Sequence, residues 1–238
     1  MTFSQTDFQV RCEWGKQGVL QLAPVSDVII VVDVLSFSTC VDIANHQGAI
    51  VYPYAWKDES AKTFAQSLKA ELADKRGSSR YSLSPASLLS LSKGIRLVLP
   101  SPNGSALSLA AGGTPTLAGC LRNCRAVALA AMTYGPQIAV VPAGEKWSDG
   151  SLRPCFEDWI GAGAIISYLE GNLSPEAYAA IATYERIQPD LERLIKQCGS
   201  GKELIERGFE QDIELATVLN ISDCVPMLVD GAYTNCAG

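Results

Sequence analysis

The sequence predicts an α/β protein: a three-layer α/β/α fold with a mostly parallel or mixed sheet and a helical C-terminal third packed on it. Two observations predict this fold. Strand-like and helix-like patterns alternate between residues 28 and 169, whereas the last third of the chain is mostly helical. Several strand patterns are uninterrupted apolar runs, which are typical of strands that helices cover on both faces.

The 238-residue chain is long enough for one large domain or two modest ones. We expect a single α/β unit over residues 1–238. The alternative is two closely packed α/β subdomains with a boundary near residues 95–120. No internal repeat and no long Pro/Gly linker marks a clean division of the chain.

The charge and the distribution of apolar residues limit the kinds of partner that this chain can bind. The net charge of −6 disfavours nucleic acid or an anionic membrane as the main partner. No apolar run reaches the ~18–20 residues of a membrane span, and residues 1–7 lack the basic and apolar pattern of a signal peptide. We therefore expect a cytoplasmic protein that does not bind membranes, and a homo-oligomer is the usual default.

The elements expected in the first half begin with an edge strand within residues 8–14. The β-branched run 28–32 predicts a central strand, and a helix is expected at about 40–45. A strand at 48–53 and an amphipathic helix at 57–75 follow. The Ser-rich residues 76–94 predict a connection with a short helix at 85–91.

The second half continues the alternation. It predicts strands at 96–99, 116–119, 137–141 and 225–229, and helices at 106–111, 122–134, 157–169, 174–184 and 189–197. Ser174 followed by Pro175 is typical of a helix start. Ser200 and Glu203 have the spacing of a capping box. Small residues at 161–164 indicate that their helix approaches the sheet closely.

Cysteine and histidine chemistry is disfavoured. The eight cysteines form no C-x-x-C pair, and buried thiols in a reducing compartment are the simplest interpretation. The single histidine, His46, excludes a site with two histidine ligands and is better explained as a residue at a helix end. Reactive groups must therefore be carboxylates, hydroxyls, amides or a bound metal.

Asp33 directly follows the central apolar run, and the hydroxyl residues Ser36, Ser38 and Thr39 follow it at a helix start. A carboxylate at the carboxyl end of a buried strand, close to a helix N-terminus, is a common position for metal or phosphate binding in α/β proteins. Plain capping of the strand end is the alternative.

A second candidate is the turn Ser101-Pro102-Asn103-Gly104-Ser105, which joins a predicted strand to a helix. Its backbone amides and polar side chains could bind an anion at the helix N-terminus. The alternative is an ordinary strand-to-helix turn.

Three further acids, Glu145, Glu157 and Asp158, lie near a strand end and at a helix start. The helix dipole alone favours acids at a helix start, so a purely structural role for the pair is the alternative. Together with Asp33, these oxygen ligands suit Mg²⁺. A phosphatase that forms an aspartyl-phosphate would have a second Asp two residues after Asp33, in an Asp-x-Asp motif. This chain lacks that second Asp, so such a mechanism is disfavoured.

Several segments together resemble one family. They are residues 31–35, 101–105, 143–145, 157–163 (Glu-Asp-x-x-Gly-Ala-Gly), 204–212 (Leu-x-x-x-Gly-x-x-x-Asp) and 225–226 (Val-Pro). In these segments, and in their order, the chain resembles the 2-phosphosulfolactate phosphatases of coenzyme M biosynthesis, the ComB family. Each segment is weak evidence alone, but the set spans most of the chain.

The resemblance implies a Mg²⁺-dependent phosphatase that converts the small anionic substrate 2-phosphosulfolactate to sulfolactate and phosphate. By position, Asp33, Glu145 and Glu157 would hold Mg²⁺, and Asp33, Glu145 and Asp158 would carry out catalysis. The division of these roles stays open. Residues that would bind the substrate are Ser36, Ser38, Thr39, Ser101, Asn103, Gly104 and Ser105.

Position 36 departs from the family pattern. The family usually has Asp-Val-Leu-Arg at the first strand end, whereas this chain has Ser36 in place of the Arg. A guanidinium is a natural bidentate partner for phosphate or sulfonate. We interpret Arg153 as a candidate to supply the charge from elsewhere. A hydrolase with a different anionic substrate, or a non-catalytic binding protein of the same fold, are the alternatives.

Overall fold

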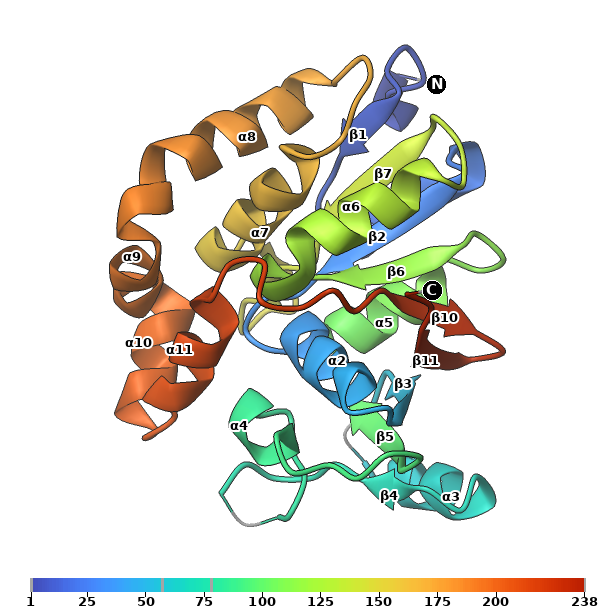
Figure 1. Cartoon of the computed structure of the whole chain (residues 1–238), viewed down its shortest axis with the longest axis vertical. Coiled ribbons are helices and arrows are strands. Elements are labelled where there is room, and N and C mark those ends of the chain that lie inside the picture. Colours follow the sequence, from blue (N-terminus) through green and yellow to red (C-terminus); the bar gives the residue numbers. More distant parts are fainter. Residues whose placement is uncertain (1, 57, 78, 238) are drawn as a thin grey trace.

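The computed structural model describes residues 2–56, 58–77 and 79–237, and its centre is a mixed sheet (Figure 1). The strand order is β1-β7-β2-β6-β10-β11-β3-β5-β4. The strands are β1 (Val10–Cys12), β2 (Val28–Val32), β3 (Ile50–Tyr54), β4 (Glu71–Leu72), β5 (Arg96–Pro100), β6 (Thr116–Gly119), β7 (Ile138–Pro142), β10 (Pro226–Val229) and β11 (Ala232–Asn235). A separate hairpin consists of β8 (Glu145–Lys146) and β9 (Leu152–Arg153). The predicted fold class is confirmed.

Helices cover both faces of this sheet. In chain order, the helices are α1 (Gly15–Leu22), α2 (Phe37–His46), α3 (Glu59–Ser67), α4 (Pro85–Leu88), α5 (Gly104–Ala110), α6 (Cys124–Met132), α7 (Phe156–Ile166), α8 (Pro175–Ile187), α9 (Leu191–Gln197), α10 (Gly199–Glu206) and α11 (Glu210–Thr217). No helix within the described ranges is long and apolar enough to cross a bilayer.

The central strand β2 explains why its sequence is apolar throughout. Val28, Ile30 and Val32 belong to the core formed with α6 and α7. The alternate residues, Ile29 and Val31, belong to a second core formed with α1 and α5 on the opposite face. Side chains alternate between the faces of a strand, so a strand between two helical layers must be apolar at every position.

The hairpin β10–β11 joins two parallel parts of the sheet. β10 pairs antiparallel with β6, and β11 pairs antiparallel with β3. Three successive antiparallel pairings reverse the direction, so β3, β5 and β4 run opposite to β2 and β7. The sequence predicted β10 but missed β11, whose short, half-polar segment has no clear strand pattern.

Several predicted boundaries are wrong. The helix predicted at 57–75 is only α3, because Leu72 pairs with Val98 in the sheet and tertiary pairing overrides the helical pattern; residue 57 lies outside the described residues. Helix α1 was not predicted. The Ser200–Glu203 capping box is also wrong: Cys198 caps α10, and its sulfur accepts from the amide of Gly201.

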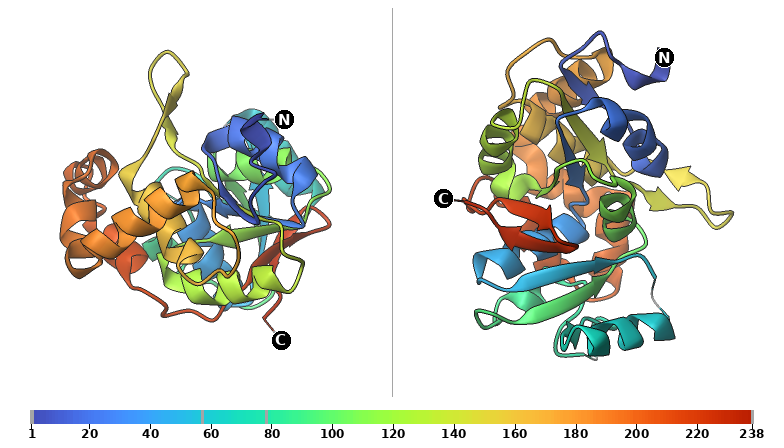
Figure 2. Two further views of the ribbon diagram at one scale, coloured as in Figure 1. Left: turned by 90° about the horizontal axis from the view of Figure 1, so that it is seen from above. Right: turned by 90° about the vertical axis from the view of Figure 1, so that its right-hand side faces the viewer.

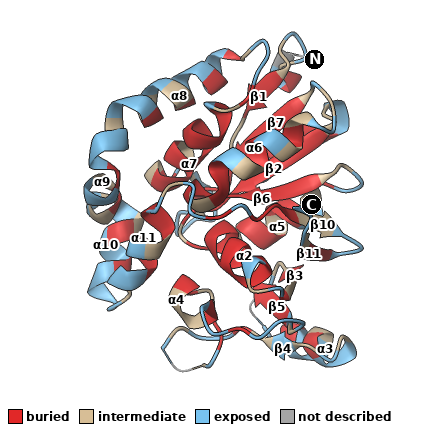
Figure 3. Ribbon diagram, in the orientation of Figure 1, coloured by how far each residue is buried: buried red, intermediate tan, exposed pale blue. Residues whose placement is uncertain are grey.

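Helix α8 packs along α7, whereas α9, α10 and α11 pack on one another, and the outer surfaces of all four are exposed (Figure 3). Gly161 of α7 permits the close approach to the sheet that the sequence indicated, whereas Gly163 permits close packing against α8. A Cβ on Gly161 would lie 2.6 Å from Val34 beside the sheet, and a Cβ on Gly163 would lie 2.2 Å from the carbonyl oxygen of Ala180 in α8.

Replacing Gly163 with alanine should therefore destabilise the fold. Overpacking against the α8 backbone should cost about 1–3 kcal/mol, which exceeds the ~1 kcal/mol that alanine gains over glycine in a helix. Urea denaturation measures the change in the free energy of unfolding. Gly113→Ala is the matched control, because no atom lies within 4 Å of a Cβ there. Equal stability of the two variants would contradict the packing argument.

Candidate active site

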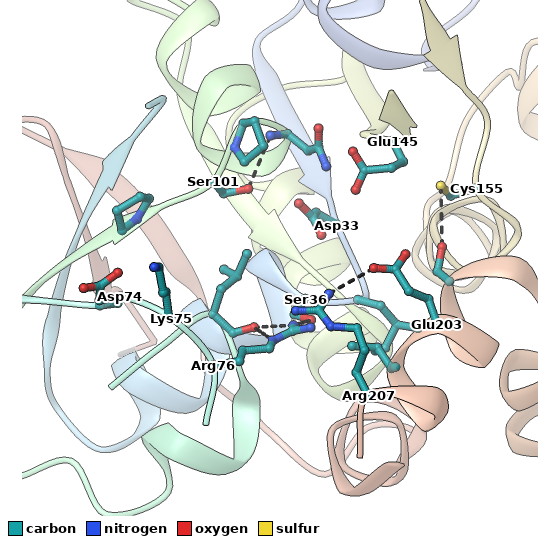
Figure 4. Close-up of a pocket in the computed structure, with 18 of the residues that line it drawn as sticks. Asp33, Ser36, Asp74, Lys75, Arg76, Ser101, Glu145, Cys155, Glu203 and Arg207 are labelled. Carbon is teal, nitrogen blue, oxygen red and sulfur yellow. Dashed lines mark hydrogen bonds and ion pairs between the residues drawn. The ribbon is translucent and has the colours of Figure 1, made fainter. Parts of the chain in front are cut away.

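A pocket of about 740 Å³ lies where the carboxyl ends of β2, β5 and β7 meet α7, α10 and the segment 58–83 (Figure 4). Most of the predicted site residues line it: Asp33, Ser36, Ser101, Asn103, Glu145, Arg153, Glu157 and Asp158. Acids that are far apart in the sequence are therefore brought to one cavity.

Asp33 is 5% exposed and uses both carboxylate oxygens. Oδ1 accepts from the amide of Phe37 at 3.0 Å, and Oδ2 accepts from the amide of Gly104 at 2.9 Å. These amides belong to the first turns of α2 and α5. The carboxylate thus ties the end of β2 to two helix N-termini, where partial positive charge favours an anion.

Asp158 makes an equivalent pair of hydrogen bonds, to the loops that follow β2 and β7. It is 3% exposed. Its Oδ1 accepts from the amide of Val34 at 2.8 Å, and its Oδ2 accepts from the amide of Gly144 at 2.9 Å. Gly144 has a φ of +67°, a conformation that suits glycine. Asp158 therefore holds the loops after β2 and β7 against α7.

Burial of these acids raises their pKa values. Burial, and to a smaller extent the charges of Glu145 and Glu157, together raise the pKa of Asp33 to about 6 despite its two backbone hydrogen bonds. Burial, followed by the charges of Asp33 and Glu157, raises the pKa of Asp158 well above its ordinary value. The groups around Asp33 and Asp158 therefore compensate only in part for the cost of burying their negative charges.

Glu157 and Glu145, together with Asp33 and Asp158, form what we call the acidic side of the pocket. Glu157 is 3% exposed, and its Oε2 accepts from the thiol of Cys198 at 3.3 Å. Glu145 is half-buried and begins the β8–β9 hairpin, where it pairs across the strands with Arg153. This hairpin projects from the body of the protein, in yellow at the top of the left view of Figure 2.

The other predicted binding residues do not line the pocket. The hydroxyls of Ser38, Thr39 and Ser105 donate to the carbonyl oxygens of Val31, Val34 and Leu99, respectively. Gly104 presents its amide to Asp33, and a Cβ there would lie 2.2 Å from the Phe37 ring. These four residues lie in the wall that supports the pocket.

The acidic side fits a hard divalent cation in its chemistry. All of its charged donors are carboxylate oxygens, which Mg²⁺ prefers, and two of them, Asp33 and Asp158, have pKa values that burial raises. Within the described ranges, no group of three or more His, Cys, Asp or Glu side chains has the spacing to hold a metal ion. Mg²⁺ is usually bound through one or two carboxylates together with water and substrate oxygens.

Sequence reasoning missed the basic side of the pocket. Arg76 and Arg207 line the cavity, together with Lys62 and Lys75. Arg76 lies in the Ser-rich stretch that was interpreted as a connection. The one signal available was the cluster of basic residues 75, 76 and 80 at the start of that stretch.

The α/β fold and the acidic pocket at its strand ends define a protein with a carboxylate-rich site for a small ligand. The sequence profile of 2-phosphosulpholactate phosphatase matches residues 18–231. A probable 2-phosphosulfolactate phosphatase of Carboxydothermus hydrogenoformans is 31% identical over 83% of this chain and 84% of its own length. The 2-phosphosulfolactate phosphatase of Methanothermobacter thermautotrophicus is 34% identical over 58% of each chain.

The chain therefore belongs to the 2-phosphosulfolactate phosphatase family, a family of phosphoric monoester hydrolases. The family predicted from the motifs is confirmed. A third relative, a probable 2-phosphosulfolactate phosphatase of Thermotoga maritima, is 38% identical over 34% of this chain and 36% of its own length.

The raised pKa of Asp33 predicts a pH-dependent stability. Below its ordinary pKa of 3.8, both folded and unfolded states hold the proton. Because the folded state binds this proton more tightly than the unfolded state, the raised pKa adds to the free energy of unfolding at low pH. This contribution is lost as the pH rises through the folded-state pKa of about 6. The stability advantage of wild type over Asp33→Asn should thus fall, by on the order of 2–3 kcal/mol, between about pH 4 and pH 8.

Chemical denaturation in the presence of a chelator measures this difference at each pH. Asn cannot satisfy both backbone amides, but that cost does not change with pH and cancels in the comparison. A constant difference between the two proteins across this range would contradict the pKa shift.

Proposed function

We propose that this protein is a Mg²⁺-dependent phosphatase that hydrolyses a small phosphorylated acid, 2-phosphosulfolactate, to sulfolactate and phosphate. The observation that carries the proposal is the convergence of four acids, Asp33, Glu145, Glu157 and Asp158, on one pocket of a chain in this family. The names of the relatives support the choice of substrate.

One or two of Asp33, Glu145 and Glu157 would hold Mg²⁺, together with water and phosphate oxygens, because all three line the same cavity. The cation would neutralise charge on the phosphoryl group and favour a nucleophilic water. Glu145 is the most exposed of these acids and is suited to accept a proton from that water as it attacks phosphorus.

Asp158 is the proposed source of the proton for the leaving oxygen. Its raised pKa favours the protonated carboxyl group, and it lines the same pocket. The bond between phosphorus and the ester oxygen breaks, and the hydroxyl group of the product acid takes up the proton. The two backbone bonds of Asp158 keep the group at a fixed position.

Ser101, Asn103 and Arg153 are the proposed phosphate contacts. Arg153 is adjacent to Glu145 across the hairpin, and its Nη2 donates to the hydroxyl of Ser200 at 3.4 Å. Its guanidinium also lies 5.7 Å from the centroid of the Trp147 ring. Arg153 can thus place a positive charge beside the acidic side of the pocket.

Phosphate release from 2-phosphosulfolactate tests the activity. Wild type should need Mg²⁺, and Asp33→Asn and Glu145→Gln should each lower kcat/KM by about 10²-fold or more, because each removes a proposed cation ligand. Glu185→Gln, an exposed acid on α8, is the control and should retain full activity. Turnover that is independent of Mg²⁺ would remove the cation from the mechanism.

Arg153→Ala should lower kcat/KM by about tenfold or more, because it removes a charged hydrogen-bond donor from the phosphate. Arg125→Ala, an exposed residue on α6, is the matched control. The measurement is steady-state phosphate release at saturating Mg²⁺. An unchanged kcat/KM for Arg153→Ala would leave Arg153 without a role in catalysis.

A hydrolase acting on another anionic ester is the second candidate, and Ser36 is the observation that favours it. Turnover of other phosphate monoesters, with no turnover of 2-phosphosulfolactate, would support this candidate. Binding of the ester without turnover in Mg²⁺ would instead support a non-catalytic binding protein.

A further inference from the structure

The pocket has a second, basic side that the proposed chemistry does not use. Figure 4 shows Asp33 and Glu145 on one side of Ser36, and Arg76 and Arg207 on the other. The transferred phosphoryl group belongs with the acidic side, where the proposed cation and catalytic acids lie. A substrate held in this way would place its non-transferred part toward the basic side.

Arg76 is held firmly at this position. Its side chain is only 12% exposed. Nε donates to the carbonyl oxygen of Leu83 at 2.7 Å, and Nη2 donates to the same oxygen and to the hydroxyl of Ser36. The guanidinium also lies 5.6 Å from the centroid of the Phe209 ring. A fixed guanidinium loses little conformational entropy when it binds an anion.

Arg76 keeps a free edge. Nη1 makes no hydrogen bond to any residue that the structure describes. The contact with Ser36 brings the guanidinium to the loop that follows Asp33, which lines the same cavity. Arg207 adds a second guanidinium 5.9 Å from the Phe209 ring, although Glu203 pairs with it at 3.0 Å.

Asp212 contacts Arg76 from outside the pocket and helps to position it. It is 1% exposed and does not line the pocket. Oδ1 accepts from the hydroxyl of Ser84 at 2.6 Å and from the amide of Ala86 at 3.1 Å, which fixes α4. Oδ2 lies 3.9 Å from Nε of Arg76 and has no hydrogen bond within the described chain. Its charge therefore keeps the buried guanidinium in place.

We propose that Arg76, beside Ser36, binds an acidic group of the substrate other than the phosphate, a sulfonate or a carboxylate, and so selects phosphorylated acids over simple phosphate esters. This inference rests on the proposed phosphatase function. A planar guanidinium matches both oxyanion groups. Asp212 acts as a positioning residue for this contact.

Three esters test the proposal with the whole protein in Mg²⁺: 2-phosphosulfolactate, 2-phospholactate, which lacks the sulfonate, and 4-nitrophenyl phosphate, which has no second acid. Arg76→Ala should lower kcat/KM for 2-phosphosulfolactate at least about tenfold, mainly through KM, and should change 4-nitrophenyl phosphate by less than about threefold. A loss on 2-phospholactate as well identifies the carboxylate as the bound group. A loss on 2-phosphosulfolactate alone identifies the sulfonate.

Arg80→Ala is the matched control. Arg80 belongs to the same segment, is exposed, stacks on Tyr81 at 4.9 Å and does not line the pocket. Arg76→Lys keeps the charge but not the planar fork, and it should give an intermediate KM. If Arg76→Ala lowers turnover of all three esters equally, Arg76 supports the fold or the chemistry and the proposal is overturned.

A binding measurement separates this inference from the proposed function. The product sulfolactate should raise the Tm of wild type, with a clearly smaller shift in Arg76→Ala and an unchanged shift in Arg80→Ala. If wild type hydrolyses no ester, the phosphatase proposal fails, yet this result still tests the subsite. Equal shifts in wild type and Arg76→Ala would overturn the subsite even if the phosphatase activity is present.

Discussion

Two buried carboxylates hold the functional end of this protein together. Asp33 and Asp158 accept hydrogen bonds from the backbone amides of Phe37, Gly104, Val34 and Gly144. Through these four bonds, the loop after β2 is joined to the N-termini of α2 and α5 and to the loop after β7. Strands from both parts of the sheet therefore end at one pocket, although β3 and β5 run opposite to β2. In a fully parallel sheet all carboxyl ends lie at one edge, whereas here the bond between Asp33 and Gly104 ties together the ends of two oppositely directed strands.

The same arrangement has an electrostatic cost. Burial raises the pKa values of Asp33 and Asp158, which means that their charged forms are poorly compensated by the protein. Backbone amides offset part of that cost but supply no net charge. A bound divalent cation would offset more of it and would stabilise the folded state by mass action. Architecture and chemistry thus depend on the same side chains, as is common where a site retains destabilising groups for function.

The sequence predicts the parts of this design that are local. The β-branched run 28–32, the acids at strand ends and the glycines of α7 each have a pattern within a few residues, and the structure confirms the elements they predict. The β10–β11 insertion and the basic side of the pocket depend on contacts between distant segments. Arg76 could not be placed from sequence, because its neighbours Ser36, Leu83 and Asp212 come from three separate stretches.

Contacts between distant segments also bear on position 36, where this chain has Ser36 and the family usually has an arginine. An arginine at that position would be fixed to the loop of Asp33 and would share its constraints. In this chain the guanidinium beside position 36 comes from the segment before α4 and is supported by Asp212 on α11. Asp212 also fixes α4, so the Leu204–Asp212 stretch, which the motifs marked without a role, connects the helical C-terminal third to the basic side of the pocket. If Arg76 binds the non-transferred acid as we propose, the choice of that acid can change through residues outside the strand-end loops, while the acids at those loops stay in place.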